Sequence, residues 1–389
     1  MADVVIVGAG STGAATAWQL MAMGAGRVEL VEERSAAAGT TGRSCAIVRM
    51  HYTHELLTRM ALHSRRVFET FDQQTGAPVT FRRIGWLSLA REDDVEPLTA
   101  NVQMHQAVGV DAKLLTADDA AELVPGMHVE NVGLAAWEPD SGYVDPSSST
   151  AGFVAAAERL GARYRPGVRV DRLTPDGADH WSLQTSDGPI TAGAIVVAAG
   201  FRTVELIRPL GVELPVTPIR HTVAVVRRST KFGPEHPIIS DRVVGSYYRP
   251  DVDGQTLVGA TAPYEGYPDP DIEQDRAPHD DDLIRLAERF ADRFPSERNP
   301  NIQRGYTSTY DCSPDLQPLL GPINATNVHV AVGFTGHGFK IAPAIGQMLA
   351  EKVLTGSSTL VDIDLFRPSR FDEGAEFVAP FAYSVPTLG

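Results

Sequence analysis

Three glycines near the start of the chain have the spacing of a phosphate-binding turn. Gly8, Gly10 and Gly13 form a GxGxxG pattern that follows a short apolar run and precedes a helical pattern. In such a turn the first glycine permits a tight bend, the second lets the backbone approach a pyrophosphate, and the third lets helix and strand pack closely. The free amides at the helix start, at Ser11 and Thr12, favour phosphate charge. The pattern indicates a dinucleotide site.

A carboxylate follows where a bound ribose would need one. Glu32 stands nineteen residues after Gly13, at the end of the next apolar run, and Glu33 stands beside it. At that distance a carboxylate can accept the ribose hydroxyls of a dinucleotide. The alternative is a structural turn with an unrelated surface glutamate, and the strand–turn–helix context argues against it. We therefore predict a dinucleotide site that includes both glutamates.

The segment after Glu33 bears on whether the dinucleotide is FAD or NAD. It does not begin another simple strand–helix repeat but runs through small and hydroxyl-bearing residues at positions 38–44. Thr40, Thr41, Arg43 and Ser44 can fold closely around a phosphate and a flavin ring. A flexible loop would explain the glycines of this segment but not its combination with the first motif. The sequence favours FAD.

Apolar patterns place these residues on a Rossmann-like α/β domain. Short apolar runs at 4–7, 28–31 and 195–197 are typical of strands buried on both faces, and a helix is predicted between the first two. A separate mixed sheet is predicted from the runs at 84–89, 133–137 and 222–226. The remaining predicted elements are helices at 54–71, 148–160 and 282–294, an exposed loop at 265–282, a strand at 328–332, and a helix at 343–354 with proline in its first turn.

These elements predict two domains, of which the first is discontinuous in sequence. The FAD-binding domain is expected to comprise 1–80, 146–215 and 322–389. The inserted mixed-sheet substrate domain is expected to comprise 81–145 and 216–321. The fold class is therefore α/β, with an α+β second lobe.

Composition narrows the class of protein further. Of 389 residues 43% are hydrophobic and 21% charged, which is typical of an ordinary globular protein, and the net charge of −15 argues against nucleic acid and anionic membranes as partners. Cys45 and Cys312 form no metal-ligand spacing and no disulfide framework, so no metal site is expected. The chain shows neither a secretory signal nor an apolar run long enough to span a bilayer. We expect a cytoplasmic protein without a membrane span.

Several motifs together resemble the D-amino-acid-oxidase-like superfamily of FAD enzymes, above all the sarcosine oxidases and the sarcosine oxidase beta-subunit group. The matching pieces are VVIVGAGSTGAATAWQL, GTTGRSCAIVRMHY, AIVVAAG, STYDCSPDLQPLLG and GFTGHGFKIAPAIG, which reach from the first strand to the last helix. The resemblance implies an FAD domain and a mixed sheet that covers the flavin. It also implies oxidation at a carbon bonded to an amine nitrogen, with hydride transfer to the flavin and hydrolysis of the imine.

The resemblance also implies a substrate site. Arg49 and Lys340 match the basic residues that hold the substrate carboxylate in sarcosine oxidase. An arginine guanidinium can donate two parallel hydrogen bonds to a carboxylate, and a lysine ammonium adds a point charge. For Arg49 by itself, a surface salt bridge is the alternative. Five residues fall where family members line the substrate cavity: His51, Tyr52, Tyr247, Tyr248 and Arg249. His51 or Tyr248 could orient an amine, and each could equally be a core or rim residue.

The same resemblance assigns further residues to the flavin. Gly336, His337 and Gly338 precede a helix whose N-terminus is expected to point at the flavin, where helix amides and Lys340 would stabilise negative charge. For His337 a packing role is an equal alternative. The remaining residues assigned to FAD are Val170, Ala199, Gly200 and Phe339.

At two positions this sequence differs from sarcosine oxidase, and the differences affect the expected flavin attachment and the expected electron acceptor. Ser308 stands where that enzyme attaches its flavin through cysteine, so we expect non-covalent FAD. Leu257 stands near the position of a lysine that assists O2 reduction, so the electron acceptor is O2 or another molecule. Two other functions stay open, a 2-hydroxy-acid dehydrogenase on the same scaffold and a flavin-binding subunit of a larger complex. A homo-oligomer or an accessory subunit is an open alternative as well.

Overall fold

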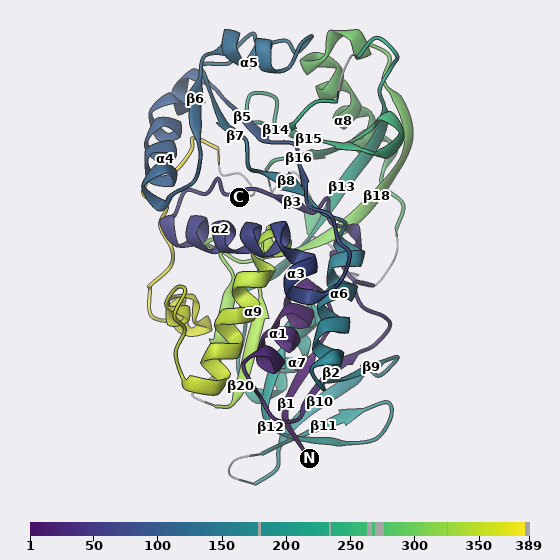
Figure 1. Cartoon of the computed structure of the whole chain (residues 1–389), viewed down its shortest axis with the longest axis vertical. Helices are drawn as coiled ribbons and strands as arrows, with labels where there is room; N and C mark the ends of the chain where they lie inside the picture. Colours follow the sequence, from purple (N-terminus) through teal and green to yellow (C-terminus); the bar gives the residue numbers. More distant parts are fainter. Residues whose placement is uncertain (178–179, 233–234, 263–266, 269–275, 325, 386–389) are drawn as a thin grey trace.

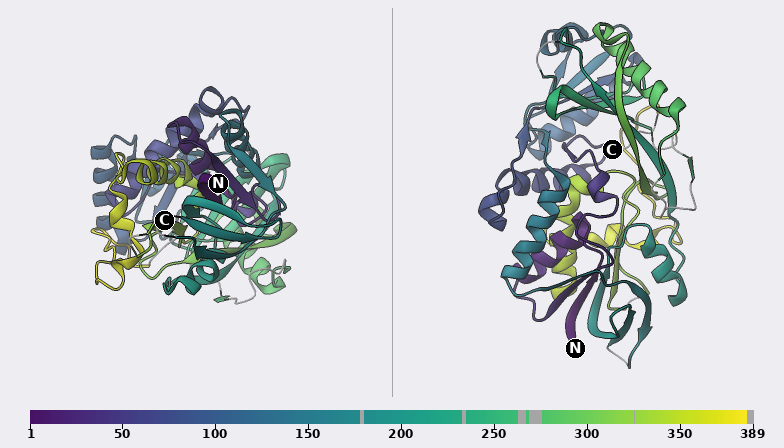
Figure 2. Two further views of the ribbon diagram at one scale, coloured as in Figure 1. Left: turned by 90° about the horizontal axis from the view of Figure 1, so that it is seen from below. Right: turned by 90° about the vertical axis from the view of Figure 1, so that its right-hand side faces the viewer.

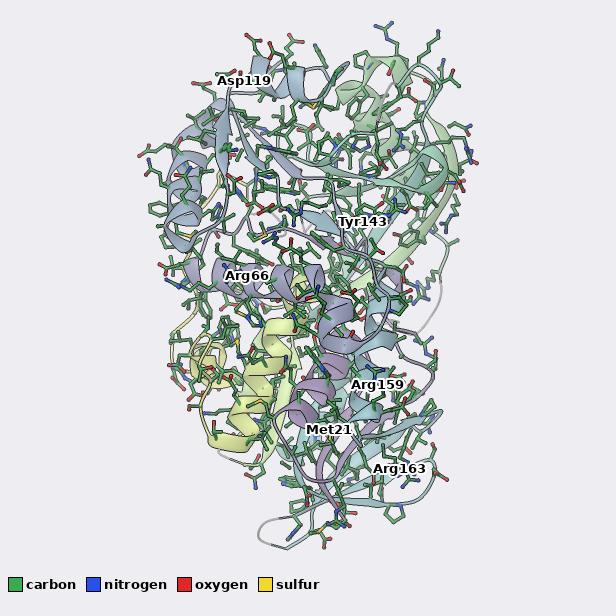
Figure 3. All side chains as sticks on the ribbon, in the orientation of Figure 1. Met21, Arg66, Asp119, Tyr143, Arg159 and Arg163 are labelled. Atoms are coloured by element: carbon green, nitrogen blue, oxygen red, sulfur yellow. The ribbon has the colours of Figure 1, made fainter. Side chains whose placement is uncertain are left out.

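Two lobes divide the molecule, and each is built on its own large β-sheet (Figure 1). The computed structural model describes residues 1–177, 180–232, 235–262, 267–268, 276–324 and 326–385. Charged side chains such as Arg66, Asp119 and Arg163 project from the outer surface (Figure 3). In the described part of the chain no helix has the length and apolar character required to cross a membrane.

The first sheet has a parallel centre formed by the N-terminal strand and its neighbours. Strand β1 (Ala2–Val7) lies between β2 (Val28–Glu32) and β12 (Ile190–Val197), so that Ile6 pairs with both Leu30 and Val196. Strand β9 (Arg163–Pro166) continues the parallel order beyond β2, and β20 (Val328–Val332) continues it beyond β12. Antiparallel strands β10 (Val170–Pro175), β11 (Trp181–Thr185) and β19 (Leu319–Pro322) complete the sheet. Strands from distant parts of the chain therefore end at one edge.

Three helices pack together beside this sheet, as the two larger views show (Figures 1 and 2). Helix α1 (Ser11–Ala22) lies between α6 (Pro146–Arg159) and α9 (Gly338–Thr355). A Cβ added at Gly346 of α9 would lie 2.7 Å from the backbone of Ala15, so only glycine permits this approach of α9 to α1. The start of α1 and the start of α9 are thereby fixed relative to each other.

The second lobe is a mixed sheet with its own helices. Its long strand β13 (Thr217–Arg227) pairs with β16 (Gln255–Ala260), β17 (Tyr267–Pro268) and β18 (Asn301–Cys312). The order continues through β15 (Ser246–Asp251), β14 (Ile238–Asp241), β5 (Trp86–Ala90), β7 (Leu134–Glu138) and β6 (Lys113–Leu115). Helices α4 (Val95–Val108), α5 (Ala117–Leu123) and α8 (Asp280–Arg293) belong to this lobe.

Smaller elements join the two lobes. Helix α2 (Glu55–Glu69) crosses between them in Figure 1, and α3 (Phe71–Thr75) follows it. A three-stranded sheet, β3 (Ile47–Val48), β8 (Gly142–Tyr143) and β4 (Arg82–Arg83), lies near the same level. Helix α7 (Arg202–Ile207) follows β12 in the first lobe. The chain between β2 and α2 therefore passes directly through the junction of the lobes.

The α/β fold class and the mixed second sheet predicted from the sequence are confirmed, whereas the start of the last helix is predicted wrongly. Helix α9 begins at Gly338, so Pro343 lies in its interior, where proline removes one backbone donor. The next amide, Ala344 N–H, donates to Ser64 Oγ of α2 at 3.1 Å, so that helix α2 supplies an acceptor at the interruption. Much of the exposed loop predicted at 265–282 lies outside the described residues.

Candidate active site

A cavity of about 300 Å³ lies at the carboxyl ends of the central parallel strands and extends beneath the second sheet. Its lining includes Gly8 after β1, Glu32 at the end of β2 and Ala199 after β12. Open α/β sheets bind ligands at this edge, because neighbouring strand-to-helix turns meet there. From the second lobe the lining receives residues of β13, β15 and β18. The cavity therefore combines a turn for phosphates with a cover from the other sheet.

The glycine turn has the geometry that its sequence predicts. Gly8 has a φ of +101°, and an added Cβ there would lie 2.5 Å from the carbonyl oxygen of Ala198. A Cβ at Gly13 would lie 1.9 Å from the carbonyl oxygen of Gly8, so this glycine permits α1 to pack against the turn. Gly13 itself is outside the cavity lining, while Gly10, at the N-terminus of α1, is part of it.

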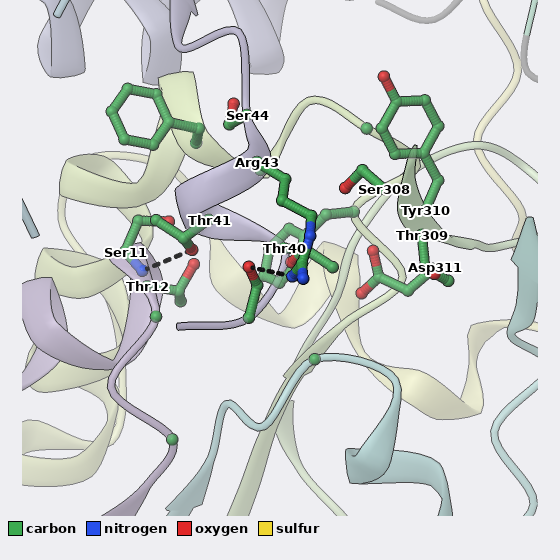
Figure 4. A pocket seen from close by; sticks show the side chains of 18 of the residues that line it. Ser11, Thr12, Thr40, Thr41, Arg43, Ser44, Ser308, Thr309, Tyr310 and Asp311 are labelled. Carbon is green, nitrogen blue, oxygen red and sulfur yellow. Dashed lines mark hydrogen bonds between the residues drawn. The ribbon is translucent and has the colours of Figure 1, made fainter. Parts of the chain in front are cut away.

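The loop at 40–44 lies against the N-terminus of α1 in the cavity wall (Figure 4). Its position is fixed by a hydrogen bond of 3.1 Å from the Ser11 amide to Thr41 Oγ1. Arg43 reaches back to the carbonyl oxygen of Gly39 at 3.4 Å. The lining includes all the residues predicted for FAD in these two segments, Ser11, Thr12, Thr40, Thr41, Arg43 and Ser44.

The Glu32 carboxylate is held by backbone donors on both oxygens. Oε2 accepts the Ala9 amide at 2.8 Å, and Oε1 accepts the Arg34 amide at 2.9 Å. The carboxylate thus lies beside the glycine turn as part of the cavity wall. Glu33 lines the same end of the cavity but forms a salt bridge of 2.8 Å with Arg202.

Two buried cations also line the cavity. Arg49 is 4% exposed and Lys340 is 8% exposed. Burial lowers the pKa of Lys340 well below its ordinary value, and the charge of Arg49 lowers it further. Burial also lowers the pKa of Arg49, while Tyr52 and Glu138 raise it. Lys340 forms no hydrogen bond or ion pair with the described residues, so its ammonium group is available to an anion in the cavity.

Local structure fixes both cations. Arg49 donates to the carbonyl oxygen of His51, and its guanidinium lies over the rings of Tyr52 and Trp86 at 4.8 and 5.5 Å from their centroids. Lys340 lies in the first turn of α9, directly after the glycine-rich segment. Helix packing therefore determines where its side chain begins.

The glycine-rich segment before α9 is anchored from β18. The Asp311 carboxylate accepts the Gly333 amide at 2.8 Å, and its backbone oxygen accepts the Thr335 amide at 3.0 Å. Burial raises the pKa of Asp311 to about 6. A Cβ at Gly336 would lie 2.8 Å from the ring of Tyr310, so the segment passes directly beneath this ring. Gly336, Gly338, Phe339 and Lys340 reach the cavity, as do Val170, Ala199 and Gly200.

Three residues assigned to the site from the sequence do not reach the cavity lining. Tyr248 is fully buried on the opposite face of β15, because successive strand residues point to opposite sides, and its hydroxyl donates to the carbonyl oxygen of Arg289 at 3.1 Å. His51 points away as well, with Nε2 at 2.6 Å from the Tyr383 hydroxyl. His337 caps the start of α9, where Nε2 lies 2.9 Å from the carbonyl oxygen of Leu316. These three side chains contact other parts of the protein rather than the cavity.

Tyr247 lines the cavity, and so do Cys45, His221 and Tyr310, which sequence reasoning did not assign to the site. Cys45 Sγ lies 3.2 Å from the Tyr247 hydroxyl and 3.7 Å from the Tyr306 hydroxyl. The rings of His221 and Tyr310 stack with centroids 4.5 Å apart, and burial lowers the pKa of His221 to about 4. Four consecutive residues of β18, 308–311, line the cavity, so no period-two pattern marked Tyr310 in the sequence.

The two positions that depart from sarcosine oxidase differ in their location. Ser308 lines the cavity, next to Tyr310 and Thr309 in Figure 4. Leu257 of β16 is 4% exposed and packs with Val223 and Val225, outside the lining. Ser308 is thus placed where a residue could contact a bound cofactor, whereas Leu257 is a core residue.

A cluster of metal-ligating residue types lies behind Arg49. One ligand atom each from His51, His105 and Glu138 lie within 4.8 Å of one another, and all three residues are fully buried. Burial, then His105, then the cations Arg242 and Arg49 lower the pKa of His51 well below its ordinary value. Two guanidinium groups this close would repel a metal cation in a low-dielectric interior. We therefore interpret the cluster as a buried polar network in which Glu138 lies 3.9 Å from His51.

Fold and cavity together define a dinucleotide-binding enzyme, and comparison with known proteins identifies its family. The family model described as "DAO: FAD dependent oxidoreductase" matches residues 3–352. The chain therefore belongs to this family, and its cofactor is FAD.

Individual relatives agree with this assignment. The chain is 28% identical to 4-methylaminobutanoate oxidase (formaldehyde-forming) of Paenarthrobacter nicotinovorans over 93% of its length but only 45% of that protein. It is 28% identical to monomeric sarcosine oxidase of Streptomyces avermitilis, with 95% and 97% of the two chains covered. The structure of L-proline dehydrogenase from P. horikoshii superposes with a TM-score of 0.87 at 26% identity, covering 96% and 98%. The chain thus spans less than half the length of some relatives and nearly all of others.

The residues present fit FAD. The glycine turn, the α1 amides and the loop at 40–44 form a cradle in which a Cβ at Gly10 would already crowd Thr41 Oγ1 at 3.2 Å. The Glu32 carboxylate is oriented beside this cradle. Beyond it the cavity continues between Gly336 and the second lobe, which leaves space for the rest of a long cofactor.

Replacing Glu32 tests this end of the site. Glu32→Ala is expected to weaken FAD binding by roughly 1.5–3 kcal/mol, because a charge-assisted acceptor for the ribose is lost. Equilibrium titration of the apoprotein with FAD measures the change. Glu29→Ala is the control, since Glu29 is on the same strand, pairs with Arg165 and is outside the lining. Equal affinities of Glu32→Ala and wild type would contradict the assignment.

Proposed function

We propose that the chain oxidises the carbon–nitrogen bond of a small secondary amine or amino acid that carries a carboxylate. The observation that supports this most directly is the pair of buried cations, Arg49 and Lys340, at one cavity. A buried cation is costly unless an anion accompanies it. Among the described residues Lys340 has no anionic partner, and a substrate carboxylate would supply one beside Arg49 at the same cavity.

The proposed roles follow from the chemistry of the two side chains. The Arg49 guanidinium presents a planar fork that can hold both carboxylate oxygens, and Lys340 adds a point charge. The same two positive charges disfavour a protonated amine nearby, so the substrate is held with its amine uncharged. When bound, FAD accepts the two electrons removed from the substrate. The imine product then hydrolyses in water to a carbonyl compound and an amine, and O2 or another acceptor completes the cycle.

The names of relatives support this substrate class. Both relatives above are named for N-methylated amino acids, 4-methylaminobutanoate and sarcosine, and the superposed structure is named for L-proline. All three named substrates contain a secondary amine and a carboxylate. We therefore propose that the substrate is a secondary amino acid rather than a primary amine.

Removal of either cation tests the proposed carboxylate clamp, which consists of Arg49 and Lys340. Arg49→Ala and Lys340→Ala are each expected to weaken the productive complex by roughly 2–5 kcal/mol, because the substrate carboxylate loses a partner in a closed site. The measurement is anaerobic flavin reduction by a panel of secondary amino acids, followed by loss of flavin absorbance. Lys352→Ala is the control, since Lys352 lies at the other end of α9 and pairs with Asp364. Equal reduction rates in all variants would refute the carboxylate clamp.

The lowered pKa of Lys340 predicts a pH dependence of anion binding. The protonated form binds the carboxylate, so affinity should fall as pH rises through the pKa of Lys340, which lies well below 10.5 because of burial and Arg49. Benzoate is a suitable probe because it has a carboxylate and no amine to titrate. In Lys340→Arg this alkaline decrease should disappear, since guanidinium stays charged. Identical pH profiles of benzoate affinity in wild type and variant would contradict the prediction.

Ser308 predicts that FAD is held without a covalent bond. A serine hydroxyl cannot form the thioether that the family resemblance places at this position. Acid or heat denaturation is expected to release all of the flavin into the supernatant. Flavin fluorescence that stays with the polypeptide on a denaturing gel would show that another residue forms a link.

A further inference from the structure

Arg49 has a partner that the cavity itself does not supply. Its guanidinium donates to the carbonyl oxygen of His51, two residues along the chain. The His51 ring is buried at 1% exposure, and it lies 4.8 Å from the ring of Trp86 and 4.6 Å from that of His105. Any group that fixes His51 therefore also fixes the acceptor of the Arg49 hydrogen bond.

That group is Tyr383, which comes from the segment after α9. Its hydroxyl lies 2.6 Å from His51 Nε2, and the two rings stack with centroids 6.1 Å apart. Tyr383 is 7% exposed, and the Arg242 guanidinium lies over its ring at 3.8 Å. Tyr383 is thus packed between His51 and Arg242 at the junction of the lobes.

The segment that carries Tyr383 is attached to the second lobe on both sides of this residue. Asn101 Nδ2 of α4 donates to the carbonyl oxygen of Phe381 at 2.9 Å. The Ser384 amide donates to Asp94 Oδ1 at 2.7 Å. In Figure 1 the yellow chain after α9 rises past α2 to reach α4. The end of the first lobe therefore crosses the junction and delivers one aromatic side chain to the support of Arg49.

We propose that Tyr383 is a positioning residue that acts through His51 to hold the Arg49 guanidinium in place for the substrate carboxylate. This inference rests on the proposed carboxylate clamp. Tyr383 does not line the cavity, so its effect reaches the ligand through the residues behind the cavity wall, of which His51 contacts the Tyr383 hydroxyl. The C-terminal segment thereby influences the affinity of the site without touching the ligand.

The test removes the Tyr383 hydroxyl and keeps its ring. Tyr383→Phe is expected to weaken benzoate binding about three- to tenfold, the effect of losing one buried hydrogen bond, as measured by changes in the flavin absorption spectrum. With an oxidisable amino acid, KM should rise by the same factor, and the limiting rate of flavin reduction should stay within about twofold of wild type. Val378→Ala is the matched control, because Val378 lies in the same segment and is 79% exposed.

A double-mutant cycle shows whether Tyr383 acts through Arg49. In an Arg49→Lys background the geometry that Tyr383 supports is already lost, so adding Tyr383→Phe should change benzoate affinity less than about twofold. The same three- to tenfold loss in that background would overturn the inference, as would unchanged affinity in Tyr383→Phe alone. If Arg49→Lys binds benzoate as tightly as wild type, the carboxylate clamp itself fails, and the role of Tyr383 fails with it.

Discussion

The burial of two positive charges beside one cavity is the constraint on which the site depends. Arg49 and Lys340 each lose hydration, and the charge of Arg49 lowers the pKa of Lys340 further. Lys340 also lies in the first turn of α9, where the helix dipole favours anions rather than cations. A buried charge is costly unless an opposite charge or hydrogen bonds accompany it. The proposed substrate carboxylate would give the Lys340 ammonium group such a partner in the cavity.

The two lobes meet different requirements of the same cofactor. The first lobe brings the turn at Gly8, the amides of α1 and the Glu32 carboxylate together because parallel strands end at one edge. The second lobe contributes neutral, aromatic side chains such as Tyr310 and His221 from strands that cover the cavity. The cavity lining therefore combines charged groups with aromatic rings.

Neutral polar groups connect the lobes behind the cations. Tyr52 lies 3.3 Å from His337 Nδ1 at the start of α9, while His51 accepts the Arg49 hydrogen bond and contacts Tyr383. Burial lowers the pKa of His337 to about 3, so this imidazole stays uncharged near neutral pH. Two adjacent residues therefore contact the surroundings of both cations. His51 contacts Arg49, and Tyr52 contacts His337 near Lys340. Neutral contacts can fix their positions without cancelling their charge.

Local sequence alone determined the dinucleotide end of the site, because Gly8, Gly13 and Glu32 are specified by one strand–helix–strand unit whose geometry follows from short-range spacing. Tertiary structure decided what depends on contacts between distant segments. It placed Arg49 and Lys340 at one cavity although almost 300 residues separate them in the chain. It turned Tyr248 away from the cavity through strand register, and it brought Tyr383 to His51. No local pattern encodes such contacts, because burial and pairing across the lobes exist only once both sheets are packed together.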